Sequence, residues 1–154
     1  ERVFFVARKK SLGWEDLKMN VSAKRVLVDE ALRASTVALE PSCELTPAIS
    51  IMYHQIPFGK SGAVAREGSF FNWMKLNPYS RAPTLAAANL YMHPTERRFL
   101  CVDEWRTMSS FPKDYNFGER GGAFAKYLMG MSVPPLMAHC VSKNIVEQWF
   151  DGKA

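Results

Sequence analysis

Two adjacent prolines constrain the fold of this chain more than any other feature. Pro134 and Pro135 stand in the stretch GMSVPPLMAHC, and a proline inside a helix removes a hydrogen bond and clashes with the preceding turn. In the first turn of a helix the missing N–H costs nothing. An apolar stripe at roughly helical spacing follows: Leu136, Cys140, Val141, Ile145 and Trp149. The sequence therefore predicts a helix that starts at the prolines, is capped by Ser132 and runs to Phe150, with a tight turn at Gly130 before it.

Shorter patterns predict the remaining elements. Residues 2–8, RVFFVAR, are β-branched and aromatic and predict a buried strand. A short helix pattern lies within residues 23–35, a possible strand runs from Ile49 to Tyr53, and a second helix is predicted from Val102 to Ser110. Three prolines between residues 78 and 94 favour turns and extended segments. The expected fold class is mixed α/β.

The composition suits one domain, or a small domain joined to a piece of another, because 47% of the 154 residues are hydrophobic. Three cysteines and three histidines show no paired spacing, so neither a disulfide framework nor a zinc site is indicated. A reducing, intracellular compartment is the expectation. No apolar run reaches the length of a membrane span. Because Glu1 leads straight into a strand-like run, we expect the chain to be a piece of a longer polypeptide.

Positive charge is concentrated in the middle of the chain. The net charge is +5, and residues 8–95 hold 11 Lys/Arg against 7 Asp/Glu, whereas residues 96–154 hold 8 against 7. A basic excess of this kind fits contact with a polyanion such as nucleic acid. An ordinary basic surface accounts for it equally well, so charge alone does not decide between them.

The stretch FGKSG, residues 58–62, invites comparison with a phosphate-binding loop. That motif needs a glycine five residues before the Gly-Lys pair, and His54 stands there. A glycine-rich surface turn is the better interpretation, and it could still bring Lys60 close to a nucleic-acid phosphate. Cys101 has no histidine beside it, which favours a buried structural cysteine over a nucleophile.

Several stretches, in order, resemble the second half of a DNA cytosine-5 methyltransferase. ERVFFVAR resembles the strand that reads RxRxFxVxxR in that family, and NPYSRAPTL resembles a Pro-x-x-Thr turn. RFLCVDEWRTMSSFPKDYNF, residues 98–117, is similar to RxLTxxExxRLQSFPDDYxF, and GMSVPPLMA, residues 130–138, to GNSVPPxLA. The matched positions in the third stretch are Arg98, Leu100, Glu104, Arg106, Ser110, Phe111, Pro112, Asp114, Tyr115 and Phe117.

The resemblance implies a base-flipping reaction, in which a cysteine thiolate attacks an extruded cytosine and S-adenosylmethionine supplies the methyl group. Arg2 would hold the flipped pyrimidine through rigid donors and a charge that does not titrate away. Gly130, Ser132 and Val133 would approach the cofactor, with Gly130 permitting a tight backbone. Lys60, Arg66 and Arg81 are expected to contact the phosphates of double-stranded DNA.

The resemblance also divides the chain. Residues 1–10 would be the last strand region of the catalytic domain, 11–95 the target-recognition region, 96–131 a small-domain scaffold, and 132–154 a C-terminal helix that packs back on the catalytic domain. The fold would be the C-terminal part of a Rossmann-like methyltransferase with a small, loop- and strand-rich recognition domain. No metal and no membrane are implied as partners. The expected location is the cytoplasm of a bacterial or phage-infected cell, at the nucleoid.

The sequence departs from the family at Met131, where asparagine is usual, and at Cys101, where threonine is usual. It also lacks the FxGxG cofactor loop, the Pro-Cys nucleophile and the Glu-Asn-Val motif. We therefore expect a recognition and closing half whose nucleophile comes from another segment or a separate catalytic chain. The alternative is a non-catalytic remnant that acts as a DNA-binding or protein-interaction module, and a weaker third option is action on transfer RNA.

Overall fold

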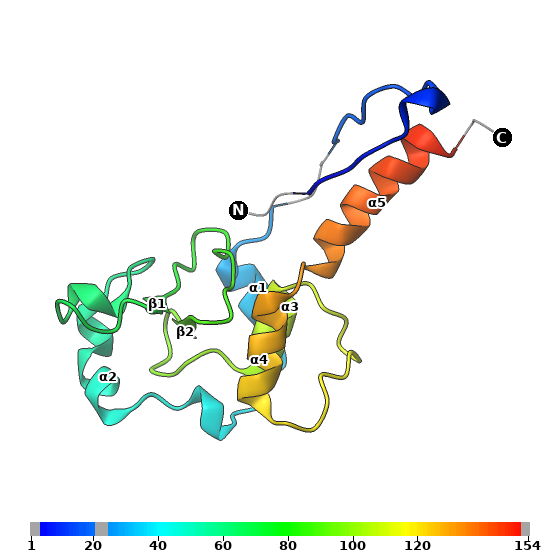
Figure 1. Cartoon of the computed structure of the whole chain (residues 1–154). Coiled ribbons are helices and arrows are strands. Elements are labelled where there is room, and N and C mark those ends of the chain that lie inside the picture. Colours follow the sequence, from blue (N-terminus) through cyan, green and yellow to red (C-terminus); the bar gives the residue numbers. More distant parts are fainter. Residues whose placement is uncertain (1–3, 21–24, 152–154) are drawn as a thin grey trace.

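The computed structural model describes residues 4–20 and 25–151, in which five α-helices and one small sheet are embedded in long loops (Figure 1). The helices are α1 (Val28–Ala34), α2 (Pro47–Met52), α3 (Val102–Met108), α4 (Gly122–Met131) and α5 (Pro135–Trp149). The strands β1 (Trp73–Lys75) and β2 (Leu90–Met92) pair in parallel, with Trp73 opposite Leu90. Short 3-10 helices span Lys10–Leu12, Pro41–Cys43, Tyr53–Gln55 and Gly62–Val64.

Helices α1, α3 and α4 and strand β2 enclose the main core. Trp105 of α3 packs edge-on against Tyr91 of β2, with 5.3 Å between the ring centroids. The buried Tyr91 hydroxyl donates to the Thr84 carbonyl at 2.9 Å and accepts from Ala86 N at 3.0 Å, so its polar atom is paired. The buried members of this core are Val28, Leu32, Leu76, Leu85, Tyr91, Leu100, Trp105, Ala125 and Met129. Removal of their apolar surface from water stabilises the arrangement of the three helices.

A second, smaller core lies under the loops of residues 43–75. It consists of Ile49, Tyr53, Ile56, Met92 and Phe99, with Phe70 and Trp73 packed against it. Strand β2 joins the two cores, because Tyr91 belongs to the first and its neighbour Met92 to the second. Alternation of side chains along a strand produces this division.

The segment from Ile49 to Tyr53 is helical, so its prediction as a strand is wrong. Pro47 occupies the first turn of α2, where its missing N–H leaves no carbonyl unpaired. Ile49 and Tyr53 are four residues apart and both are buried in the second core, which is the spacing of one helix face. The segment pairs with neither described strand. Tertiary burial of that face decided the local structure.

Helix α5 projects from the globular part, and the N-terminal segment lies beside it (Figure 1). Two side-chain amides of α5 bind the backbone of that segment. Asn144 accepts from Asn20 N and donates to Asn20 O at 2.9 and 3.2 Å, and Gln148 does the same with Lys18 at 2.9 and 2.7 Å. Each amide thus takes the place of a peptide group in a neighbouring strand. The Trp149 ring, tilted by 31° against the ring of Trp14 with 5.6 Å between the centroids, completes this contact.

The predicted strand of residues 2–8 is absent from its described part. Residues 4–9 have no strand partner among the described residues, and Phe5 is 95% exposed. A strand needs a neighbour to satisfy its backbone groups, and the described chain offers none there. Residues 1–3, Arg2 among them, lie outside the described residues. The expectation of a strand-rich recognition region is also corrected, because the described strands in it are three residues each.

The other helix predictions are confirmed with shorter bounds. Helix α1 begins at Val28, and α3 begins at Val102 and ends before the Phe111-Pro112 pair. The last helix begins at Pro135 with Pro134 at its cap position, as the two prolines predict. Helix α4 was not expected from the sequence.

The junction between α4 and α5 corrects the roles expected of Gly130 and Ser132. Gly130 lies inside the last turn of α4, not in a tight turn, and a Cβ added there would stand 2.4 Å from Ala87 N. The glycine is needed because the helix touches the backbone of residues 86–87. Ser132 ends α4, and its hydroxyl donates to Leu128 O at 2.7 Å. It therefore does not cap α5.

Replacement of Gly130 by Ala should lower the free energy of unfolding by about 1–3 kcal/mol, because the new methyl group meets fixed backbone. Met131→Ala, at the neighbouring exposed position, is the matched control and should change it by less than about 0.5 kcal/mol. Urea denaturation of both variants measures the difference. Equal stability of the two variants would contradict the close contact between α4 and residues 86–87.

Candidate functional site

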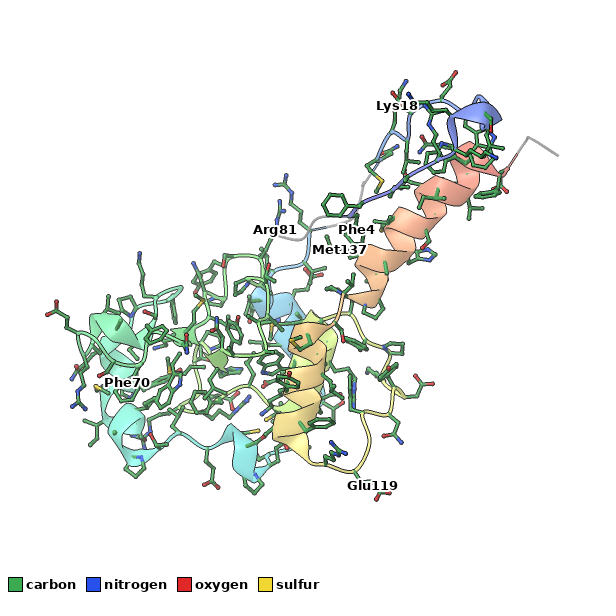
Figure 2. The ribbon with its side chains drawn as sticks, viewed as in Figure 1. Phe4, Lys18, Phe70, Arg81, Glu119 and Met137 are labelled. Carbon is green, nitrogen blue, oxygen red and sulfur yellow. The ribbon has the colours of Figure 1, made fainter. Side chains whose placement is uncertain are left out.

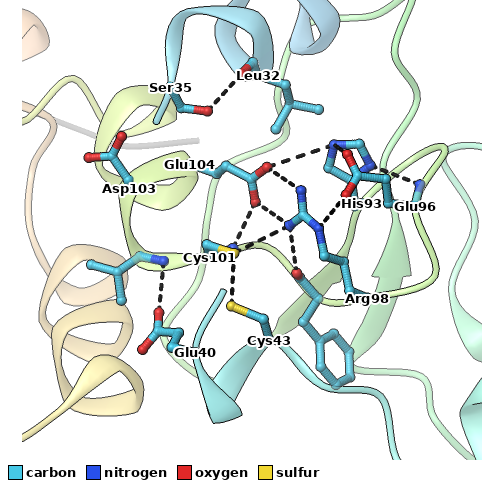
Figure 3. A network of polar contacts seen from close by, with 12 residues as sticks. Leu32, Ser35, Glu40, Cys43, His93, Glu96, Arg98, Cys101, Asp103 and Glu104 are labelled. Carbon is cyan, nitrogen blue, oxygen red and sulfur yellow. Dashed lines mark hydrogen bonds and ion pairs between the residues drawn. The ribbon is translucent and has the colours of Figure 1, made fainter. Parts of the chain in front are cut away.

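A buried ion pair joins the end of β2 to the start of α3 (Figure 3). Arg98 Nη1 and Nη2 each donate to one oxygen of Glu104, both at 2.7 Å. The two residues are only 7% and 1% exposed. Glu104 also accepts from the backbone N–H of Cys101 at 2.7 Å, which is its part in a capping box at the start of α3. Both carboxylate oxygens are therefore engaged, which a buried charge requires.

The surroundings of the pair hold it in its charged form. Burial opposes the charge of Arg98, but hydrogen bonds to Glu104 and Glu96 outweigh it and raise the Arg98 pKa above its usual value. Burial and the charge of Arg98 lower the pKa of His93. His93 Nδ1 accepts from the backbone N–H of Glu96 at 3.0 Å. This histidine therefore acts as a neutral acceptor that orders a turn, and its geometry gives no sign of a catalytic base.

Lys60 and Arg81, two residues predicted to bind DNA, lie on adjoining segments. The Lys60 carbonyl accepts from Lys75 N at 3.0 Å. The rings of Phe58 and Tyr79 meet edge to face with 6.4 Å between centroids. Tyr79 is 79% exposed, and Arg81 projects from the surface (Figure 2). Phe58, Lys60, Tyr79 and Arg81 are called the basic-aromatic edge below.

A buried lysine supports this edge from beneath. Lys75 Nζ lies 4.0 Å from the ring centroid of Tyr53 and 5.3 Å from that of Phe58, and it donates to Tyr53 O at 3.3 Å. Burial lowers its pKa, and no carboxylate among the described residues forms an ion pair with it. The turn of residues 58–62 is a surface turn, as predicted, since Gly59 adopts a φ of 73° and donates to Lys75 O. Cation–π contact holds the ammonium in place.

The other predicted site residues are not part of this edge. Arg66 is exposed and lies over the ring of Phe70, 6.0 Å from its centroid. Gly130, Ser132 and Val133 stand together at the α4–α5 junction, but the Ser132 hydroxyl is used within α4. What this junction exposes is the side chains of Met131 and Val133. It could supply one wall of a cofactor site but does not form a complete one.

Sequence reasoning identified Arg98 and Glu104 only as parts of a motif and missed Lys75, Phe58 and Tyr79. The Arg98–Glu104 pair carried a usable signal, because Cys101 and Glu104 have the spacing of a capping box. The basic-aromatic edge carried no such signal, since its members come from two separate loops.

Among the described residues, no group of three or more His, Cys, Asp or Glu side chains is placed to hold a metal ion. No described helix is long and apolar enough to cross a membrane.

Residues 42–147 match the family model of the C-5 cytosine-specific DNA methylases. The chain belongs to this family. The matched range begins at the segment that carries Cys43 and includes the second core, the main core apart from Val28 and Leu32, the Arg98–Glu104 pair and most of α5. The buried arrangement at the start of α3 therefore lies within the matched segment.

Two curated relatives are similar to part of the chain. The putative type II methyltransferase M.MJ0563P of Methanocaldococcus jannaschii is 39% identical over 79 residues, which are 51% of this chain and 25% of the relative. The type II methyltransferase M.AquIB of Picosynechococcus sp. is 33% identical over 91 residues, covering 51% of this chain and 66% of the relative. The chain thus covers less than two thirds of either relative. No solved structure matches it significantly.

Glu104→Gln should lower the free energy of unfolding by roughly 3–5 kcal/mol, because it leaves the buried Arg98 charge without its carboxylate. Glu96→Gln is the matched control: this side chain is 55% exposed, and its loss should cost about 1 kcal/mol or less. Chemical denaturation at neutral pH measures both. Similar stability of the two variants would mean that the Arg98–Glu104 pair does not hold the cores together.

Proposed function

We propose that this chain is the target-recognition and closing part of a DNA (cytosine-5) methyltransferase. Its loops contact double-stranded DNA, and a catalytic part, in another segment or a separate chain, supplies the nucleophile and most of the S-adenosylmethionine site. The observation that carries the proposal is the family match over residues 42–147 in a chain that lacks the Pro-Cys nucleophile and the glycine-rich cofactor loop. A polypeptide with this sequence alone has no thiol placed for attack on cytosine.

The exposed part of α5 supports a missing partner. Leu136 is 64% exposed, and the neighbouring Val133 and Met137 are also exposed. Further along the same helix Trp149 is buried, because the N-terminal segment covers it. Several open apolar side chains thus gather at the first turns of α5 and the junction before it, next to the residues of the GNSVPP-like motif, and Val146 and Phe150 are exposed farther along. Burial of such side chains against a second body would stabilise a complex.

The short length of the second relative, M.AquIB, also fits an enzyme that is divided between two chains. The match covers 66% of M.AquIB but only 51% of this chain, so M.AquIB is the shorter polypeptide. M.AquIB is named as a type II methyltransferase although it is this short. This supports the proposal that a short chain can be one part of such an enzyme.

The cofactor would meet this chain at the α4–α5 junction. When bound, S-adenosylmethionine supplies the methyl group. Val133 and Met131 would exclude water from one side of it, and Gly130 would keep the junction seated on residues 86–87. Arg2, outside the described residues, stays a proposal for the residue that holds the flipped base.

The basic-aromatic edge is the DNA contact that we propose. Lys60→Ala and Arg81→Ala should each weaken binding to duplex DNA about 3- to 10-fold. Each should also make the slope of log binding constant against log salt concentration less steep by about one, because one fewer counterion is released. Arg66→Ala is predicted to weaken binding as well. Tyr79→Ala should lower affinity without a change in the salt slope, because it removes no charge. Fluorescence anisotropy over a range of salt concentrations measures all four.

Lys113→Ala, which removes an exposed lysine from the scaffold loop, is the matched control and should bind as the unmodified chain does. Unchanged affinity in both the Lys60 and Arg81 variants would remove the edge from the DNA interface.

Addition of a polypeptide that carries the missing motifs should restore methyl transfer from labelled S-adenosylmethionine to cytosine in duplex DNA. Leu136→Asp should abolish both co-purification of the two chains and transfer, because it places a charge on the surface that would be buried. Ser142→Asp, at an exposed position of the same helix, should leave both intact. Activity of this chain without any partner would overturn the proposed division of labour.

A further inference from the structure

Two buried thiols meet beside the Arg98–Glu104 pair (Figure 3). The Sγ atoms of Cys43 and Cys101 are 2.8 Å apart, although the residues are separated by 58 positions in the sequence. Their side chains belong to residues that are only 2% and 1% exposed. The third cysteine, Cys140, lies on α5 and is half-buried. The arrangement therefore singles out one pair of thiols.

Hydrogen bonds around both cysteines fix the two residues relative to each other. The Phe99 N–H donates to Cys43 O at 2.7 Å. Glu40, three residues before Cys43, accepts from Val102 N at 3.0 Å. Lys126 of α4 donates to the Ser42 hydroxyl at 2.7 Å. The sulfur atoms of a disulfide are about 2.05 Å apart, so this pair needs to close by less than about 1 Å.

An open cavity borders one of the two cysteines. Cys43 lines an open cavity of about 590 Å³, together with Glu44, Leu45, Arg97 and Arg98. Cys101 is not among the residues that line this cavity and stands behind Cys43. A small oxidant therefore reaches Cys43 first.

We propose that Cys43 and Cys101 form an oxidation site that closes to an intramolecular disulfide. Hydrogen peroxide converts the Cys43 thiol to a sulfenic acid and releases one water. The Cys101 sulfur then displaces the sulfenic oxygen, which leaves as a second water with the Cys101 proton. Two thiols and one peroxide thus give one disulfide and two waters.

The environment of Cys101 fits the second role. Burial and the hydrogen bond with Cys43 raise the pKa of Cys101 to about 12, so at neutral pH it is a protonated thiol. A protonated thiol is a poor target for peroxide. It can still react once a sulfenic acid forms beside it, since no diffusion is needed.

The disulfide would close a loop that contains α2, β1, β2 and the basic-aromatic edge. A cross-link across 58 residues stabilises mainly by reducing the freedom of the unfolded chain, and the effect grows with loop length. It would tie the recognition region to the start of α3. The sulfur of Cys101 keeps its lone pairs, so the contact with Arg98 Nη1 at 3.4 Å can persist.

Treatment of the reduced full chain with hydrogen peroxide tests this site without DNA or a partner chain. We expect a loss of two hydrogen atoms by intact mass, a Cys43–Cys101 cross-linked peptide after digestion, and a rise in Tm of roughly 5–10 °C that dithiothreitol reverses. Cys140→Ser should behave in the same way. Cys101→Ser and Cys101→Thr should form no cross-link and show no rise in Tm.

Cys101→Thr restores the residue usual in the family, so it keeps the test valid if the serine variant fails to fold. Free Cys43 and Cys101 after treatment would overturn the proposal. So would a cross-link to Cys140, or a stable sulfenic acid at Cys43 with Cys101 unmodified.

Discussion

The Arg98–Glu104 ion pair is the interaction on which the rest of the structure depends. It lies where strand β2 passes into helix α3, and this connection carries Phe99 into the second core and Leu100 into the main core. A buried carboxylate is tolerated only when every oxygen is paired, and here Arg98 and the Cys101 N–H provide those partners. The pair thereby fixes the start of α3, and with it the packing of Trp105 between the three helices.

The loops around the second core derive their order from that frame. Residues 43–75 contain few regular elements, yet they fold over Ile49, Tyr53 and Met92 because β2 holds Met92 in place. Lys75 then forms the link between core and surface: its backbone binds the turn of residues 58–62, and its ammonium group lies under Phe58. A loop surface built in this way presents charge and aromatic rings in a fixed arrangement at the edge of the small β1–β2 sheet.

Helix α5 projects from the globular part of the structure, and its two ends differ. Near Trp149 the chain's own N-terminal segment covers the helix, and hydrogen bonds from its backbone to Asn144 and Gln148 hold it there. Near Leu136 the face is open. The exposed apolar side chains beside the family motif are the physical basis for the proposed catalytic partner, since isolated chains do not gain by exposing them.

The sequence by itself determined the features that depend on neighbouring residues: the start of α5 at Pro135, the helices α1 and α3, the surface turn at Gly59, and the family. Only the tertiary structure decided what depends on distant segments. It made Ile49–Tyr53 helical because one face could be buried, and it required Gly130 because α4 touches residues 86–87. It also brought Cys43 to Cys101 across 58 positions. Local patterns encode helix caps and turns, whereas contacts between separate loops arise only when the chain closes on a common core.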